Sequence, residues 1–329
     1  MKNVTLSIGS GGKDMHAFIN DYIVKKLGNN ILNRMDDAGV LDLKGGRLAF
    51  TTDSYVVSPI FFEGGDIGLL CVCGTVNDVA TSGARVVALS LAFILEDGVS
   101  LEDICKVIDS IAKTCKEANV KIVTGDTKVV EKGKGDKIYI NTAGIGLIED
   151  GVHISSHNAQ LNDQVVVTGS VGDHEVAMMR ARGLINLDVK VKSDAAPLNL
   201  LVEELLKKTK DIHVIKDPTR GGLASALFEI ASNSNCEIRL VEETIPISKD
   251  TKAVCDLLGL DPLYLANEGK YVILCPKDST KAVLTVFGKN AKVIGSVVSI
   301  GKVKLNIETF SGGIRRLGML DSVQLPRIC

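Results

Sequence analysis

Acidic side chains in the first half of the sequence stand beside glycine or directly after apolar stretches. Asp53 follows Leu48–Thr52, Asp66 follows two glycines, Asp78 interrupts an apolar run, and Asp126 follows Gly125. Each one alone is typical of a turn or a helix cap. Together they are the oxygen ligands that suit Mg²⁺, which completes its shell with water and phosphate. The set therefore favours phosphate chemistry assisted by magnesium.

Lys128 adds a cation to this set. It lies two residues after Asp126, so both side chains point to the same face if the strand that precedes them continues. A lysine in this position is suited to stabilising phosphate charge.

The second half of the sequence contains an anion-binding pattern. Asp217-Pro218-Thr219-Arg220-Gly221-Gly222 opens a predicted helix that runs through Ala231. A helix N-terminus with a nearby arginine attracts anions. Further on, Glu268 falls in a turn between Asn267 and Gly269, before a predicted strand over 271–275.

The N-terminus is glycine-rich, with Gly9-Ser10-Gly11-Gly12 before Lys13. Such glycines let backbone N–H groups approach phosphates. The spacing is not that of a P-loop and no strand precedes it, so from the residues alone a flexible arm is the simpler interpretation.

The sequence ends in Pro326-Arg327-Ile328-Cys329. Proline resists helix formation, so a short tail of this kind is expected to stay extended and movable. The terminal carboxylate is expected to raise the pKa of the Cys329 thiol, with Arg327 to offset it. A thiol of this kind is better suited to being loaded by a partner than to spontaneous attack. The other cysteines fall mostly in apolar patterns, as in 70–73, which predicts reduced and buried thiols.

The elements that must position these residues mix strands and helices without a regular βαβ rhythm, which predicts an α+β fold. Helices are expected at about 15–27, 67–82, 101–118, 173–182, 198–208 and 279–288, and strands at 48–52, 86–95, 120–124, 136–148, 164–168, 293–298 and 302–307. The 329 residues indicate two domains, 1–150 and 151–310, followed by a flexible tail over 311–329.

Composition narrows the class of protein. Hydrophobic residues make up 45% of the chain and aromatic ones 4%, so aliphatic side chains must fill the core. The net charge of −2 and the lack of a basic block argue against nucleic acid as a partner. Apolar runs too short to span a bilayer and the lack of a signal peptide indicate a soluble cytoplasmic protein with no membrane partner.

These motifs together resemble those of the aminoimidazole-ribonucleotide-synthetase-like (PurM-like) ATP enzymes and, within them, the carbamoyl dehydratases of [NiFe] hydrogenase maturation. The resemblance extends over essentially the whole chain. It rests on 9–12, 51–54, 65–66, 76–80, 125–130, 217–222 and 267–269, and the last four residues point to the carbamoyl dehydratases.

The resemblance implies a two-domain PurM-like architecture of mixed sheets flanked by helices, and a homodimer whose N-terminal halves pair and share the ATP sites. It also implies a reaction. Cys329 receives a carbamoyl group from the carbamoyltransferase HypF, and ATP drives dehydration of the thiocarbamate to a thiocyanate. The cyano group then passes through the HypC–HypD complex to the hydrogenase iron.

Site residues follow from matching the motifs position by position. The predicted contacts to ATP are Gly11, Gly12, Asp53, Asp66, Asn77, Asp78, Gly125, Asp126, Thr127, Asp217 and Arg220, with Mg²⁺ on Asp53, Asp78 and Asp126. Cys329 carries the substrate, and Lys128 stabilises the transferred phosphoryl group. Glu268 is the candidate base for the nitrogen protons, with His174 a weaker second.

Two other functions fit part of the pattern. One is a different ATP enzyme of the same superfamily, of the selenophosphate synthetase or thiamine-monophosphate kinase type. The first of these needs a reactive cysteine near the N-terminal glycines, whereas the first cysteine here is Cys71. The other is a non-enzymatic thiol carrier whose conformation is set by ATP.

Overall fold

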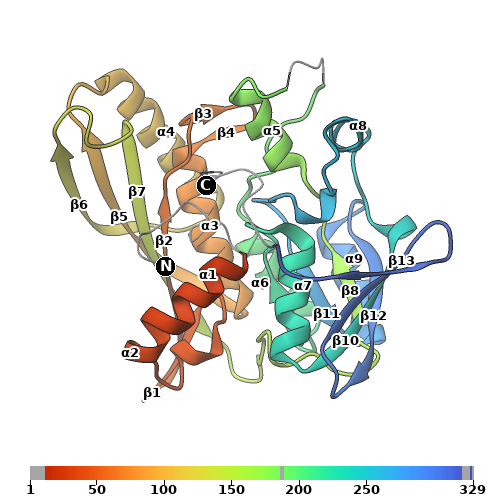
Figure 1. Cartoon of the computed structure of the whole chain (residues 1–329). Coiled ribbons are helices and arrows are strands. Elements are labelled where there is room, and N and C mark those ends of the chain that lie inside the picture. Colours follow the sequence, from red (N-terminus) through yellow and green to blue (C-terminus); the bar gives the residue numbers. More distant parts are fainter. Residues whose placement is uncertain (1–11, 186–188, 321–326, 328–329) are drawn as a thin grey trace.

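The computed structural model describes residues 12–185, 189–320 and 327 of the chain. They form two α+β units, the first coloured red to yellow and the second green to blue in Figure 1. Each unit is built around one sheet, of five strands in the first and seven in the second. The predicted α+β class is therefore confirmed.

The first sheet has the strand order β1-β2-β7-β5-β6. Its pairs are antiparallel except for β5 and β6, which are parallel and are connected through helix α4. A separate two-stranded ribbon, β3 with β4, precedes α3. The strands of this unit are β1 Gly39–Leu43, β2 Gly46–Tyr55, β3 Phe61–Phe62, β4 Gly65–Asp66, β5 Ala84–Glu96, β6 Ile122–Val130 and β7 Ile138–Ile148.

Helices cover one face of this sheet, and α3 lies against β2, β7 and β5. Alternation along the strands explains this, since Tyr55, Leu89 and Ile140 are buried toward the helices while Phe50 and Leu147 on the other face are exposed. The predicted N-terminal helix is present in three consecutive segments, α1 Lys13–Phe18, the π-helix η2 Ile19–Val24 and α2 Lys25–Leu27. The other helices of this unit are η3 Leu32–Arg34, α3 Ile67–Thr81 and α4 Leu101–Glu117.

Local sequence sets both ends of α3. The Asp66 side chain accepts hydrogen bonds from the backbone N–H groups of Gly68 (2.7 Å) and Leu69 (2.9 Å), as an N-cap does. At the other end Gly83 has φ of 75°, a left-handed conformation that favours glycine and stops the helix.

The second sheet has the order β14-β13-β10-β12-β8-β11-β9. Its strands are β8 Gln164–Val167, β9 Val214–Lys216, β10 Cys236–Val241, β11 Val272–Cys275, β12 Lys292–Ile300, β13 Lys304–Glu308 and β14 Ile314–Leu317. The helices of this unit are α5 Asp173–Ala181, α6 Asn199–Lys208, α7 Gly222–Asn233, η4 Glu242–Thr244, α8 Lys249–Leu258, η5 Pro262–Tyr264 and α9 Lys277–Phe287. Among the described residues, none of these or the earlier helices is long and apolar enough to cross a membrane.

Strand β14 corrects one expectation. The sequence places the start of the tail at Ser311, but Ile314–Leu317 pairs antiparallel with β13, so the sheet extends to Leu317. The turn at Gly312, with φ of 78°, is the hairpin that makes this pairing possible. Two exposed glycines in sequence do not distinguish a hairpin from a flexible linker.

Asn77 of α3 joins the two units. Its side-chain N–H donates to the Ala196 carbonyl (3.0 Å), its side-chain oxygen accepts from the Leu198 N–H (2.7 Å), and its own carbonyl accepts from the Tyr271 hydroxyl (2.8 Å). Because these groups are buried, the bonds fix the second unit against α3.

Candidate functional site

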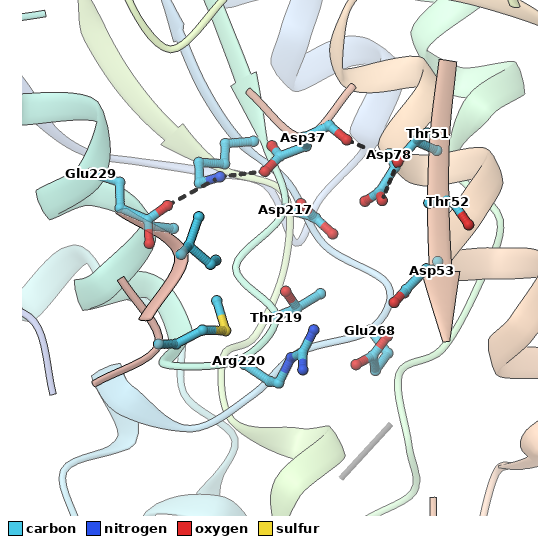
Figure 2. Close-up of a pocket in the computed structure, with 15 residues that line it drawn as sticks. Asp37, Thr51, Thr52, Asp53, Asp78, Asp217, Thr219, Arg220, Glu229 and Glu268 are labelled. Atoms are coloured by element: carbon cyan, nitrogen blue, oxygen red, sulfur yellow. Dashed lines mark hydrogen bonds and ion pairs between the residues drawn. The ribbon is translucent and has the colours of Figure 1, made fainter. Parts of the chain in front are cut away.

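A cavity of about 390 Å³ lies between the two units. Figure 2 shows its side chains converging from β2, α3, the segment after β9, helix α7 and the turn that carries Glu268. The N-terminal helical segment covers part of it with Met15 and Ile19. The remaining lining residues are Asp37, Thr51, Thr52, Asp53, Gly74, Asp78, Lys216, Asp217, Thr219, Arg220, Ala226, Glu229 and Glu268.

Carboxylates dominate one side of this cavity. Asp53 comes from the end of β2, Asp78 from α3, Asp217 from the segment after β9, and Glu268 from its turn. The Thr51 hydroxyl donates to Asp78 (3.2 Å), which ties the helix residue to the strand. Burial raises the pKa of Asp78 well above its ordinary value, and the charges of Asp217 and Asp53 raise it further.

The same causes act on Asp217 and Glu268. Burial and the charge of Asp37 raise the pKa of Asp217 to about 7. Burial and the charges of Asp194 and Asp217 raise the pKa of Glu268 well above its usual range, and Arg220 opposes this shift. Glu268 is 5% exposed and its Oε1 atom has no hydrogen-bond partner among the described residues. Crowded carboxylates with an unsatisfied oxygen are a site that a cation would stabilise.

The turn that carries Glu268 is rigidly held. The Glu268 N–H donates to Asp194 (3.0 Å), and the Asn267 side-chain oxygen accepts from the Gly172 N–H (2.8 Å). At Gly269 a Cβ atom would lie 1.8 Å from the Asp194 carbonyl, so only glycine fits. The Asn-Glu-Gly pattern is thus needed to place the carboxylate.

The opposite wall of the cavity contains an ion-pair network that the sequence analysis did not predict (Figure 2). The Lys216 ammonium contacts Asp37 and lies 3.2 Å from Glu229, which in turn lies 3.1 Å from the His16 ring. Burial alone would lower the pKa of Lys216, but the charges of Asp37 and Glu229 outweigh it and raise this pKa well above its usual value. A lysine at the end of the apolar strand Val214–Lys216 was the available sequence signal.

Arg220 and Thr219 enter the cavity just before α7 (Figure 2). Gly221 and Gly222 have φ of 81° and 64°, and a Cβ at Gly222 would lie 2.6 Å from the Leu263 and Leu265 carbonyls. These glycines let the chain turn into the helix with Arg220 directed at the cavity. The prediction of an arginine beside a helix N-terminus agrees with this placement.

The residues of the 125–128 motif lie elsewhere. The expected strand was to end before the motif, whereas β6 runs through it to Val130, at the edge of the sheet. Gly125, Asp126, Thr127 and Lys128 are exposed and do not line the cavity. The Lys128 ammonium binds both Asp126 oxygens at 2.6 Å, and this bond lowers the pKa of Asp126. The structure thus unites Asp53 with Asp78 but not with Asp126. No three acidic, histidine or cysteine side chains in the described parts of the chain are close enough to hold a metal alone.

Other predicted residues have structural contacts. Asp66 caps α3, Asn77 joins the units, and Gly12 precedes α1. His174 is buried with its Nδ1 atom 2.8 Å from the Ser193 hydroxyl. Gly11 and Cys329 lie outside the described residues.

The cysteines follow the prediction with one exception. Six of the seven described cysteines are buried, whereas Cys105 is exposed on α4. The apolar pattern around Cys105 predicted a buried thiol, but the neighbouring Ile104 is the residue that packs against the core. Burial raises the pKa of the Cys71 and Cys73 thiols well above the ordinary value for cysteine.

Comparison with known proteins first defines the class. Residues 35–148 match the family model for the AIR synthase related protein N-terminal domain, and residues 160–308 match the model for the C-terminal domain. The chain is 42% identical over 332 residues to carbamoyl dehydratase HypE of Azotobacter vinelandii, with 99% of this chain and 97% of that one covered.

Solved structures of similar proteins lead to the same family. The crystal structure of the hydrogenase maturation protein HypE in complex with ATP has a TM-score of 0.83 at 46% identity, covering 99% of this chain and 100% of that one. The HypE chain of a HypE–HypF complex has a TM-score of 0.87 at 42% identity, covering 92% and 100%. The chain belongs to the HypE family of carbamoyl dehydratases.

Proposed function

We propose that this protein uses ATP to dehydrate a carbamoyl group on the sulfur of its own Cys329 to a thiocyanate, which supplies the cyanide ligand of the [NiFe] hydrogenase iron. The observation that carries the proposal is the cavity between the units, with its carboxylates on one wall and Arg220 on another. Similarity to HypE proteins over the whole chain supports the same reaction.

The cavity suits Mg·ATP. Asp53 and Asp78 would contribute carboxylate ligands to the cation, and water and phosphate oxygens would complete its shell. The cation neutralises charge on the nucleotide phosphates when it is bound. The raised pKa values of Asp78 and Asp217 support this role, because both carboxylates would be relieved of mutual repulsion by a divalent cation. Arg220 and the N-terminus of α7 would contact phosphate oxygens.

The reaction must remove oxygen from an amide, and amide oxygen is a poor leaving group. The carbamoyl oxygen attacks the γ-phosphorus of ATP, and ADP leaves. The C–O bond then breaks, inorganic phosphate departs, and the nitrogen loses its protons as the C≡N bond forms. We assign the base to Glu268, whose carboxylate lines the cavity, has an unsatisfied oxygen and is made more basic by burial, which raises its pKa.

The partners follow from the same proposal. HypF would load Cys329, and HypC–HypD would accept the cyano group. The described cysteines are all free thiols, which is consistent with the predicted cytoplasmic location.

We further propose a homodimer in which the open faces of the first sheets pair. In the pairing of β5 with β6, Lys128 lies beside Ile94 and Asp126 lies beside Ala92. The side chains of Asp126 and Lys128 therefore point to the face of the sheet away from α3. Exposed apolar side chains share this face, namely Leu41, Leu43, Phe50, Ile94 and Leu147. Thr52 lies on it too and also lines the cavity. A second copy would cover the apolar residues and bring its Asp126 and Lys128 to the cavity.

Mixed dimers test this sharing. Asp78→Asn and Asp126→Asn homodimers should both lack activity, whereas dimers refolded from an equal mixture should regain about a quarter of wild-type turnover, because one of the two sites is restored in half the molecules. Mixtures that stay inactive would place both residues in the same chain's site.

The alternatives are separated by products. Incubation with ATP, Mg²⁺, carbamoyl phosphate and HypF should first add a carbamoyl group to the protein and then remove water, as followed by mass spectrometry. A thiol carrier would release no ADP with a carbamoylated C-terminal peptide, and a small-molecule kinase would leave the mass of the protein unchanged.

A further inference from the structure

Arg327 is anchored at three points, although it lies only two residues before Cys329. Its Nε atom donates to the Val56 carbonyl (2.9 Å), and its Nη1 atom lies 2.6 Å from an oxygen of Asp136. Its carbonyl accepts a hydrogen bond from Nη2 of Arg182. Its φ of 55° lies in the left-handed region, which is uncommon for a residue other than glycine.

Both units supply these contacts. Val56 directly follows β2, the strand that carries Asp53 to the cavity, and Asp136 precedes β7. Arg182 follows α5 in the second unit, and its Nε atom donates to the Ser58 carbonyl (2.7 Å), which braces it against the first unit. The anchored point is therefore fixed relative to the ATP cavity.

A second anchor holds the chain upstream. The Tyr264 hydroxyl donates to the Gly318 carbonyl (2.9 Å), and the Lys13 N–H donates to the Leu320 carbonyl (3.1 Å). Lys13 opens helix α1, whose Met15 lines the cavity. The tail thus leaves the sheet beside the N-terminal helix and is held again at Arg327.

We propose that Asp136 and Arg182 are positioning residues that dock Arg327 and thereby present the loaded Cys329 to the ATP cavity. This inference rests on the proposed function, in which Cys329 carries the reacting group. Asp136 and the Val56 carbonyl bind two different nitrogens of one guanidinium, an arrangement that arginine satisfies and lysine does not. Arg182 binds the backbone carbonyl of Arg327, so this contact does not depend on the side chain at that position.

Tryptic cleavage after Arg327 tests docking without any catalysis, because trypsin must bind the same guanidinium. We expect Asp136→Asn to speed release of the Ile328-Cys329 dipeptide several-fold, as measured by intact mass. Glu131→Gln is the matched control, since it removes one negative charge from the same connection between β6 and β7 and should cleave as the wild type does. Equal cleavage rates for Asp136→Asn and the control would contradict the proposed docking of Arg327 by Asp136.

Turnover tests what docking does. With HypF in excess, the wild type should proceed to the thiocyanate, whereas Asp136→Asn should accumulate the carbamoylated form. We expect dehydration to slow about five- to tenfold with unchanged ATP affinity, the size expected for a partly exposed ion pair. Arg182→Gln should behave likewise. The reversed pair Asp136→Arg with Arg327→Asp should recover part of the loss seen in each single reversal. Dehydration at the wild-type rate in Asp136→Asn would refute the positioning role, while a wild type that never loses water would refute the proposed function instead.

Discussion

At the scale of single residues, the cavity contains an excess of negatively charged side chains. Asp53, Asp78, Asp217 and Glu268 face one another, while Lys216 is already engaged by Asp37 and Glu229. Burial, and after it this excess of negative charge, raises the pKa values of Asp78, Asp217 and Glu268. The nucleotide-free site is therefore electrostatically unfavourable, as a cation-binding site should be.

Asp217→Asn should reveal that excess in stability. The pKa of Asp217 is raised from 3.8 to about 7, so as pH rises through this window the unfolded chain releases its proton before the native protein does. The contribution of Asp217 to stability is thus present at low pH and lost toward pH 7. Without nucleotide, we expect the Asp217→Asn variant to gain about 2–3 kcal/mol over the wild type between pH 5 and pH 8. Urea unfolding at both values measures it, and an unchanged difference would contradict the shift.

Lys128→Ala should lower turnover by about a hundredfold and ATP affinity far less, because a cation aimed at the transferring phosphoryl group acts mainly in the transition state. Steady-state turnover and nucleotide titration separate the two effects. A loss confined to affinity, with full turnover at saturating ATP, would make Lys128 a ground-state phosphate contact.

At the scale of elements, helix α3 determines the geometry of the site. It packs on the first sheet, presents Asp78 to the cavity and uses Asn77 to fix the second unit. Its register depends on the Asp66 cap and on Gly74, where a Cβ would lie 2.3 Å from the Tyr55 hydroxyl. A small shift of this helix would move Asp78 and the boundary between the units together.

Asp66 is predicted both to cap this helix and to contact the nucleotide, and one substitution pair separates the roles. Asp66→Ala should reduce the free energy of unfolding by about 1 kcal/mol through loss of the cap, whereas Asp66→Ser should retain most of it. If both variants bind ATP as the wild type does, Asp66 acts only as the cap. Weaker binding by both, measured by calorimetry, would show the nucleotide contact.

At the scale of the whole molecule, two units enclose the cavity, and in the proposed function the substrate is carried by the chain's own terminus. The tail passes the N-terminal helix at Leu320 and meets both units at Arg327. In the proposed function, loading by a partner and dehydration in the cavity require the same terminus to be released and docked in turn.

Cys329→Ala should keep the fold and ATP binding but never acquire the carbamoyl or cyano group. Because Cys105 is an exposed thiol, Cys105→Ala is the necessary control and should be loaded and dehydrated like the wild type. Mass spectrometry after incubation with HypF decides between them. Loading and water loss in the Cys329→Ala variant would show that the tail is not the substrate.

Features that depend on local chemistry could be predicted from the sequence. The cap at Asp66, the glycines around Arg220 and the turn at Glu268 act within a few residues, so their patterns predicted helix starts and the turn correctly. The complete motifs also predicted the protein family correctly. Which charged side chains come into contact depends instead on the packing of distant segments. Lys216, Asp37 and Glu229 are far apart in sequence, and β6 continues through Asp126 because pairing with β5 outweighs the turn propensity of Gly-Asp. The hairpin that carries β14 likewise depends on β13 as its partner. Interactions of this kind have no local signature, because their energy comes from neighbours that folding alone brings together.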